Sequence, residues 1–261
     1  MNRLVASILL LALVMLTSQA CRKSKGDPTF SINIDDEFYI DLWEGLTPEY
    51  QSIHLKVATI QYQVCPEVIL DYGLENLNKR YTVTLNDLIA PENCSVDSTY
   101  ISTEIDLGDL ENGEYELRIN LRDIENKGKL TVDDQRLSIS MESDHGIALR
   151  HDELFRIPEK AIWGYLAYNA PAYETTKNAF FDDLQAITNL RNYTSGYYGY
   201  FTIEDDGYVR IARQIDFDTH SPFLLQFNGD KQELVDLLTA YRNQLGNDAD
   251  LYLYTYEGEQ L

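Results

Sequence analysis

Three side chains that could bind a cation alternate along residues 216–220. On an extended strand, Asp216, Asp218 and His220 would lie on one face, because successive side chains of a strand point to opposite sides. Two carboxylates and an imidazole together suit a hard or borderline cation. No fourth ligand is near in sequence, and the same residues suit the polar end of a strand before Pro222. We therefore expect no cofactor, and these three residues are the candidate ligands if a metal binds.

Catalytic motifs are absent from the sequence. It contains no G-x-S-x-G, and Ser143-Asp144-His145 has the residue types of a serine hydrolase only as sequence neighbours, whereas a triad is assembled in space. With 43 acidic residues, carboxylate pairs of the kind that glycosidases use arise without functional meaning. We expect a protein that is not an enzyme, with a hydrolase whose site lies between two domains as the third alternative.

The stretch Gly196–Ile203, GYYGYFTI, could stack bases or sugars on its aromatic rings. It resembles the RNP1 signature of RNA-recognition domains, in which a glycine and three aromatic residues alternate along a strand. Three features depart from that family. The stretch falls on the second predicted strand instead of the third, Tyr197 stands at the glycine position, and no basic residue immediately precedes it. The net charge of −22 also repels phosphate backbones, so we expect no nucleic-acid partner.

The N-terminus resembles a bacterial lipoprotein signal peptide. Residues 2–3 contain a positive charge, residues 4–16 are uncharged and largely apolar, and Cys21 directly follows the small residue Ala20. Ser18 stands where that family usually has leucine, and ordinary cleavage after Ala20 remains the alternative. The resemblance implies that the signal peptide, residues 1–20, is removed and that Cys21 carries the lipid.

This resemblance also implies where the protein is located. Residues 21–27 would be a short basic tether that joins the lipid anchor to the folded chain. Arg22 follows Cys21, so the acidic residue that marks retention in the inner membrane is missing. We therefore expect an exported protein that is anchored in the outer membrane and faces the periplasm, with the cell surface as the alternative.

The two remaining cysteines, Cys65 and Cys94, are expected to form a disulfide. Cysteines of an exported chain usually pair, and neither has a histidine close to it in sequence. Closing a loop of about 30 residues would stabilise the fold by about 3 kcal/mol.

The first half of the chain, residues 28–142, has the pattern of an all-β domain. Seven or so short segments rich in β-branched and aromatic residues are separated by turn signals such as Asn112-Gly113. The segment from Gly113 to Leu121 resembles the G-x-Y-x-L-x-I strand of bacterial immunoglobulin-like and fibronectin type III-like domains. That resemblance implies an immunoglobulin-like β-sandwich in which Tyr115 holds a corner of the chain. Residues 143–158 would then be a linker.

The second half, residues 159–261, mixes strands and helices. Strand patterns cover residues 161–168, 197–203, 208–217 and 251–256, and helix patterns cover residues 174–191 and 230–245. The order βαββαβ predicts an α+β ferredoxin-like domain, and residues 223–227 are an alternative extra strand. The predicted fold class is therefore multidomain, a β-sandwich followed by a ferredoxin-like domain.

Alternation along these strands predicts an aromatic face opposite the helices. Its members would be Trp163, Tyr165, Tyr198, Tyr200, Tyr208, Arg210, Tyr252, Tyr254 and Tyr256. Such a face would pack against the β-sandwich or a second copy, bind a protein partner, or form a platform for sugars. We expect a cell-envelope binding or assembly module that acts through protein–protein contacts or self-association, with a cell-surface glycan-binding protein as the alternative.

Overall fold

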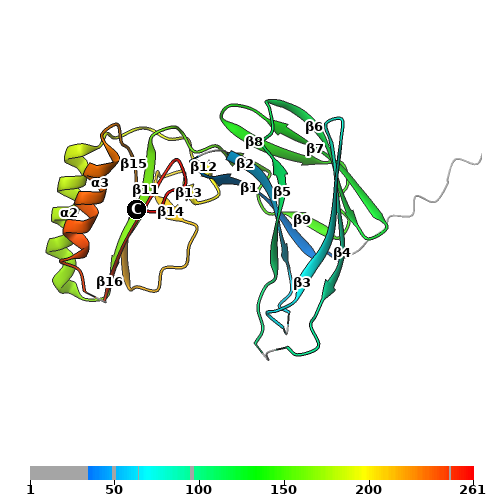
Figure 1. Cartoon of the computed structure of the whole chain (residues 1–261), viewed down its shortest axis with the longest axis horizontal. Helices are drawn as coiled ribbons and strands as arrows, with labels where there is room; N and C mark the ends of the chain where they lie inside the picture. Colours follow the sequence, from blue (N-terminus) through cyan, green and yellow to red (C-terminus); the bar gives the residue numbers. More distant parts are fainter. Residues whose placement is uncertain (1–34, 49–50, 64, 95–96, 247) are drawn as a thin grey trace, which may run out of the picture. The chain divides into compact units, whose positions relative to one another are not determined.

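The computed structural model describes residues 35–48, 51–63, 65–94, 97–246 and 248–261 (Figure 1). The predicted signal peptide, the tether and Cys21 lie outside these residues. Within them, no helix combines the length and the apolar character that a membrane span requires.

The first half of the described chain is β-rich, as predicted, and consists of two sheets. The four-stranded sheet contains, in spatial order, β5 (Ser102–Gly108), β2 (Gln51–Thr59), β1 (Phe38–Leu46) and β9 (Ile147–Leu149). The six-stranded sheet contains β10 (Glu153–Phe155), β8 (Arg136–Met141), β7 (Ile124–Val132), β6 (Gly113–Leu121), β4 (Arg80–Ile89) and β3 (Ile69–Leu77).

One hydrophobic core joins these two sheets. It includes Ile40 and Leu55 from the four-stranded sheet, and Leu117 and Ile119 from the six-stranded sheet, all fully buried. In β6 the buried residues alternate with polar ones, because only one face of the strand meets the core. Burying each such side chain stabilises the fold by about 1.5–3 kcal/mol relative to leaving it in water.

The sheet order differs from the predicted immunoglobulin-like arrangement. An immunoglobulin constant domain packs four antiparallel strands on three, whereas here six strands face four, and β4 pairs with β6 in parallel. The predicted linker, residues 143–158, contains strands: it supplies β9 to one sheet and β10 to the other. The Tyr115 hydroxyl does donate a hydrogen bond of 2.7 Å to the Glu111 carbonyl, so the expected corner contact is present.

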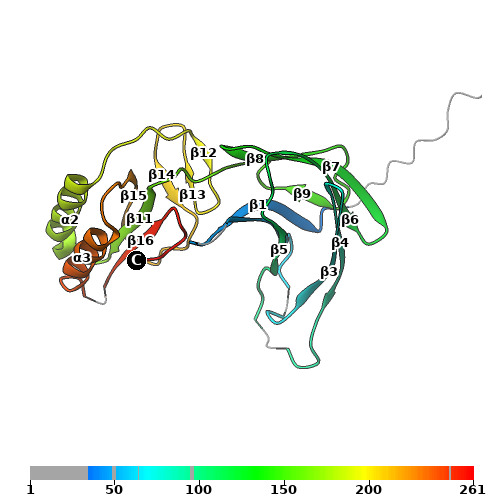
Figure 2. The ribbon, with the colours of Figure 1, turned by 45° about the horizontal axis from the view of Figure 1, so that its top comes forward.

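The second half contains a three-stranded antiparallel sheet covered by two helices. In spatial order its strands are β15 (Thr219–Gln226), β11 (Ala161–Tyr168) and β16 (Ala249–Thr255). Figures 1 and 2 show helices α2 (Glu174–Ile187) and α3 (Lys231–Arg242) side by side on one face of this sheet, and the short helix η1 (Pro171–Tyr173) precedes α2. Ile162, Leu166 and Leu253 point toward the helices, as the alternation predicts.

The predicted ferredoxin-like βαββαβ domain is wrong. Between α2 and β15 the chain forms a separate three-stranded sheet of β12 (Gly196–Tyr197), β13 (Phe201–Ile203) and β14 (Val209–Ile211). These strands do not pair with the helix-covered sheet, whose third strand is instead β15, the segment that was the alternative extra strand. In the residues described, the second half therefore has two small sheets in place of a four-stranded one.

A tight turn explains why residues 197–203 do not form one strand. Gly199 has a φ of 79°, a conformation that glycine adopts far more easily than other residues. Tyr200 N–H donates to the Tyr198 carbonyl at 2.9 Å, which reverses the chain between β12 and β13. A Cβ atom at position 199 would also lie 3.1 Å from Cδ1 of Trp43, so there is little room for a side chain.

Candidate binding surfaces

The predicted aromatic face exists on the helix-covered sheet, but it is buried. The Trp163 side chain, on the central strand β11, is only 1% exposed. Its ring is stacked with Tyr254 at 5.7 Å between centroids and lies 5.5 Å from the ring of Tyr200. Phe201 contacts it at 5.4 Å. The sheet β12–β14 therefore covers this part of the face, and no ligand can stack on it without displacing that sheet.

The other end of the aromatic face is covered by the loop that follows β14. Tyr165 and Tyr252 are buried and stacked at 5.4 Å, and Ile215 and Phe217 pack against them. The guanidinium of Arg213 lies over the Tyr252 ring at 4.4 Å. Burial and a 2.8 Å hydrogen bond from the Tyr165 hydroxyl to Asp250 raise the pKa of Tyr165 to about 12.

Four members of the predicted face lie off the helix-covered sheet: Tyr198 and Tyr200, which lie between β12 and β13, and two residues of the next hairpin. Tyr208 and Arg210 are exposed, and Arg210 forms an ion pair with Glu204 at 2.9 Å. Both belong to the hairpin β13–β14, which turns them away from the helix-covered sheet. They therefore form no common surface with Trp163 or Tyr252, and the alternation correctly identified only the residues of β11 and β16.

Strand β1 of the first half also contacts the aromatic face. The ring of Trp43 lies 5.3 Å from that of Tyr200, whose hydroxyl accepts a hydrogen bond of 3.4 Å from the backbone N–H of Leu46. Leu46 belongs to the same hydrophobic cluster as Trp163 and Tyr198. Desolvation raises the pKa of Tyr200. Residues 34–261 accordingly form one compact unit.

The candidate metal ligands do not converge. Asp216 and Asp218 precede β15, whereas His220 lies within it, and all three are exposed. Asp216 accepts a hydrogen bond from Gln214 at 2.7 Å. In the described part of the chain, the one group with three potential ligand atoms within 4.8 Å of one another is Cys65, Glu67 and Cys94. Its two cysteines form the predicted disulfide, which is confirmed.

A serine and a histidine on β2 have part of the geometry of a hydrolase. Ser52 Oγ lies 2.5 Å from Nε2 of His54, but Asp106 approaches the same ring nitrogen, at 4.0 Å. In a catalytic triad the carboxylate binds the opposite nitrogen, Nδ1, and so orients the ring. Nδ1 of His54 is buried without a partner among the described residues, and Ser52 is buried. This arrangement does not support acyl transfer.

A second histidine links β1 to the covering sheet. Nδ1 of His151 lies 3.1 and 3.2 Å from the two carboxylate oxygens of Asp41, and its ring is stacked on Tyr197 at 3.7 Å. Burial raises the pKa of Asp41, against the opposing effects of His151, Tyr197 and Arg150. These contacts link β12 to β1, and their strength depends on whether Asp41 is charged.

An apolar surface open to solvent lies on strand β3, which sequence analysis did not single out. β3 is the last strand of the six-stranded sheet, and Figure 2 shows it at the margin beside β4. Among the described residues, no strand pairs with its other side. Tyr72 and Leu74 share the face of the buried residues Leu85 and Val83, yet each is 39% exposed.

The opposite face of β3 carries an apolar residue at each end, with Asp71, Gly73 and Glu75 between them. Ile69 is 62% exposed and Leu77 is 65% exposed, and Ile69 lies across from the exposed Ile89 of β4. We call this surface, Ile69–Leu77 with Ile89, the β3 edge. The sequence did contain a signal for it, because apolar residues occupy both faces of the strand, a pattern that fits neither a half-buried strand nor a solvated one.

No protein-family model, curated protein or solved structure matches this chain. Its function must therefore be inferred from its own surfaces, and the β3 edge combines exposed apolar side chains on both faces with a side that no described strand pairs.

Proposed function

We propose that this protein is a non-enzymatic lipoprotein of the cell envelope that binds an extended segment of another envelope protein at the β3 edge. In this proposal Cys21 anchors the chain in the outer membrane, and the folded part faces the periplasm. The observation that carries the binding role is that β3, nine residues long, has one unpaired side and exposed apolar side chains on both faces.

Strand addition suits this edge physically. The unpaired N–H and C=O groups of an edge strand can hydrogen-bond to an added strand, and alternate side chains of that strand fill apolar positions on each face. Long apolar edges left open cause aggregation, so natural proteins usually shorten, charge or cover them. Tyr72 and Leu74 on one face, with Ile69 and Leu77 on the other, would be covered by such a partner.

Charge on the β3 edge favours a different chain over a second copy. In an antiparallel pair of two β3 strands, the one register that matches all nine residues is centred on Gly73 and sets Asp71 opposite Glu75. Like charges directly opposite one another destabilise a sheet. Both carboxylates are exposed, and Asp71 accepts only a neutral hydrogen bond, from Asn86 at 2.9 Å. A partner strand with lysine or arginine at alternate positions would pair favourably.

Two synthetic peptides test this proposal. One is as long as β3 and alternates valine with lysine, and the other has glutamate in place of lysine. We expect the lysine peptide to bind more tightly in calorimetry, by up to about five-fold for each charge pair, and to slow amide exchange in β3. Glu75→Lys should abolish the preference, because it changes the charge of the β3 edge from −2 to zero.

The matched control is Asp123→Lys, an equal charge change at an exposed turn outside the β3 edge. It should leave the preference for the lysine peptide intact. Unchanged exchange in β3 on addition of the lysine peptide, or a preference that Glu75→Lys does not alter, would contradict strand addition at this edge.

A further inference from the structure

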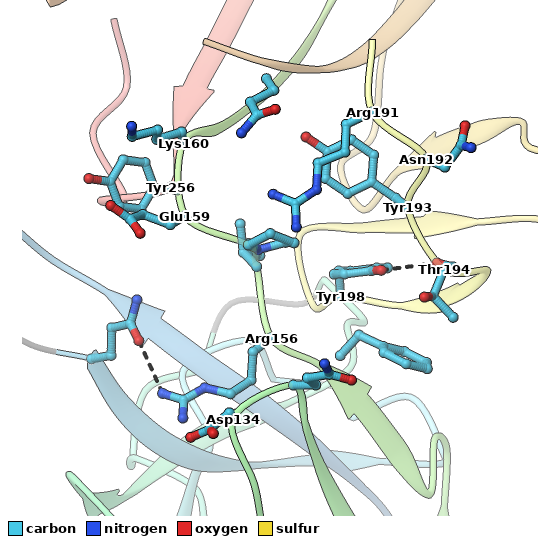
Figure 3. Close-up of a pocket in the computed structure, with 16 residues that line it drawn as sticks. Asp134, Arg156, Glu159, Lys160, Arg191, Asn192, Tyr193, Thr194, Tyr198 and Tyr256 are labelled. Atoms are coloured by element: carbon cyan, nitrogen blue, oxygen red, sulfur yellow. Dashed lines mark hydrogen bonds between the residues drawn. The ribbon is translucent and has the colours of Figure 1, made fainter. Parts of the chain in front are cut away.

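A polar cavity of about 760 Å³ lies beside the connection that joins β10 to β11 (Figure 3). Its volume falls in the range of small-molecule sites, about 300–1,000 Å³. Separate segments of the chain line it: the start of β2, the turn between β7 and β8, residues 155–160, residues 191–194 between α2 and β12, and the single residues Tyr198, Gln226 and Tyr256. A site built from segments so far apart in the sequence has a shape that the fold itself maintains.

Arg191 brings a positive charge into this cavity. Figure 3 shows its guanidinium pointing into the space beside Tyr193, whose ring centroid lies 5.7 Å away. Within the described residues, neither Arg191 nor Lys160, the second free cation of the lining, forms an ion pair. In a chain of net charge −22, two such cations in one cavity mark a place where an anion can bind.

The third cation of the lining is already neutralised. Arg156 lies 2.7 Å from the buried carboxylate of Glu44 and donates a second hydrogen bond of 3.1 Å to Gln51. A dashed line from Arg156 in Figure 3 marks this second bond. Arg156 therefore has a structural role in the cavity wall, whereas Arg191 and Lys160 are available to a ligand.

Lys160 is held in an uncommon backbone conformation. Its φ is 67°, in the left-handed region that costs a residue with a side chain of the order of 1–3 kcal/mol. The Lys160 carbonyl accepts a hydrogen bond of 2.9 Å from Phe227 N–H, which ties this turn to the end of β15. Strain of this kind is concentrated at functional sites, and here it lies in the cavity wall.

The remaining walls suit a sugar better than a bare anion. Side-chain amides of Gln51, Gln135 and Gln226 can exchange hydrogen bonds with hydroxyl groups, and the rings of Tyr193 and Tyr256 offer apolar faces. Two carboxylates, those of Asp134 and Glu159, also line the cavity. They can accept hydrogen bonds from hydroxyls, and they disfavour a multiply charged phosphate over a single carboxylate.

We propose that this cavity binds a carboxylated sugar residue, a uronate, with its carboxylate on Arg191 and its hydroxyls on the surrounding amides. Arginine matches a carboxylate with two parallel hydrogen bonds, which suits the guanidinium of Arg191 in the cavity wall. This site is independent of the β3 edge and holds whether or not a partner strand binds there.

Three ligands test this inference on the full-length protein by calorimetry. They are an oligogalacturonide, the same oligosaccharide with its carboxylates methyl-esterified, and succinate. We expect the free acid to bind most tightly, the ester to lose about ten-fold or more, since a charge-assisted hydrogen bond is absent, and succinate to bind more weakly than the free acid. Equal binding of acid and ester, or of acid and succinate, would overturn the proposal.

Arg191→Gln should lower the affinity for the free acid by about ten-fold or more while leaving the affinity for the ester unchanged. The matched control is Arg210→Gln, since Arg210 is an exposed arginine outside the cavity. A variant Arg191→Gln that discriminates acid from ester as well as the wild type does would contradict the assigned role of Arg191. Thermal unfolding of both variants, expected to match the wild type, shows that a loss of binding is not a loss of fold.

Discussion

The helix-covered sheet β15-β11-β16 and the β3 edge both carry large apolar side chains at strand spacing, but they differ in exposure. On the first, Trp163 and Tyr165 are buried under a separate small sheet and the loop after it. On the second, Ile69 and Leu77 remain open to solvent in the described chain. Sequence alternation identified the first as a candidate binding face, whereas the structure leaves only the second available.

The difference shows that apolar content does not by itself distinguish a core from a binding surface. Residues 196–218 cover the aromatic face because the chain between α2 and β15 is long enough to fold back over the sheet. Among the described residues, no comparable segment covers Ile69 and Leu77 of β3, which are 62% and 65% exposed. The comparison can be tested by perturbing each region separately.

The largest effect is expected from truncating the aromatic face. Trp163→Ala should lower the free energy of unfolding by about 3–5 kcal/mol, because it removes a buried ring and leaves a cavity between Tyr254 and Phe201. Chemical denaturation measures the change. The control is Leu77→Ala on the β3 edge, which should change the free energy by about 0.5 kcal/mol or less. Similar losses of unfolding free energy in both variants would contradict the contrast between a buried aromatic face and an exposed β3 edge.

A slightly smaller effect is expected from opening the disulfide. Cys65 and Cys94, 29 residues apart, enclose the whole hairpin β3–β4, so the bond restricts the unfolded chain and holds the base of the β3 edge. Replacing both with serine should cost about 3–4 kcal/mol by the chain-entropy estimate.

This change is measured by denaturation in a Cys21→Ser background, so that no third thiol remains. Amide exchange should accelerate most in β3 and β4 and least in β11, which lies outside the closed loop. Faster exchange in β11 than in β3 would show that the disulfide does not act locally on the edge.

The smallest effect concerns the contact between β1 and the covering sheet. Burial raises the pKa of Asp41 above its ordinary value of 3.8, so the folded state binds this proton more tightly than the unfolded chain does. The resulting stabilisation is present at low pH and is lost as the pH rises through the raised pKa. We therefore expect the free energy of unfolding of the wild type, minus that of Asp41→Asn, to decrease between about pH 3 and about pH 7.

Asp133→Asn provides a control with the opposite sign. Hydrogen bonds from the backbone N–H groups of Gln135 and Arg136 lower the pKa of Asp133, so its stabilisation is present at neutral pH and is lost as the pH falls. A difference for Asp41→Asn that grows with pH would show that its contact with His151 outweighs the cost of burial.

Several features could be predicted from the sequence, because the interactions that produce them involve residues close to one another along the chain or the chemistry of single residue types. The Asp230 side chain accepts a hydrogen bond of 2.9 Å from Gln232 N–H and so begins α3 at the predicted position. Alternation along the strands identified the helix-facing residues of β11 and β16. Pairing of the two cysteines followed from their number in a chain expected to be exported.

The wrong predictions share one cause: each relied on the pattern of neighbouring residues where a turn or a contact between distant segments decided the structure. Residues 197–203 alternate like a strand, but Gly199 reverses the chain, so Tyr198 and Tyr200 left the face that alternation had assigned to them. Residues 143–158 have no long periodic pattern, yet two three-residue strands there join both sheets of the first half. The Arg191 cavity could not be foreseen, because its walls come from segments that are distant in sequence.

By itself, the sequence determined the β-rich first half, the two helices, the side of β11 and β16 that faces them, and the disulfide. These depend on side-chain periodicity, helix capping and cysteine chemistry, which act over a few residues or one covalent bond. Only the tertiary structure decided which strands pair, which apolar face is covered and which edge stays open. Those outcomes depend on contacts between residues that are distant in sequence. Trp163, for example, is buried by Tyr200 and Phe201, and nothing in the residues next to Trp163 predicts that these two rings will cover it.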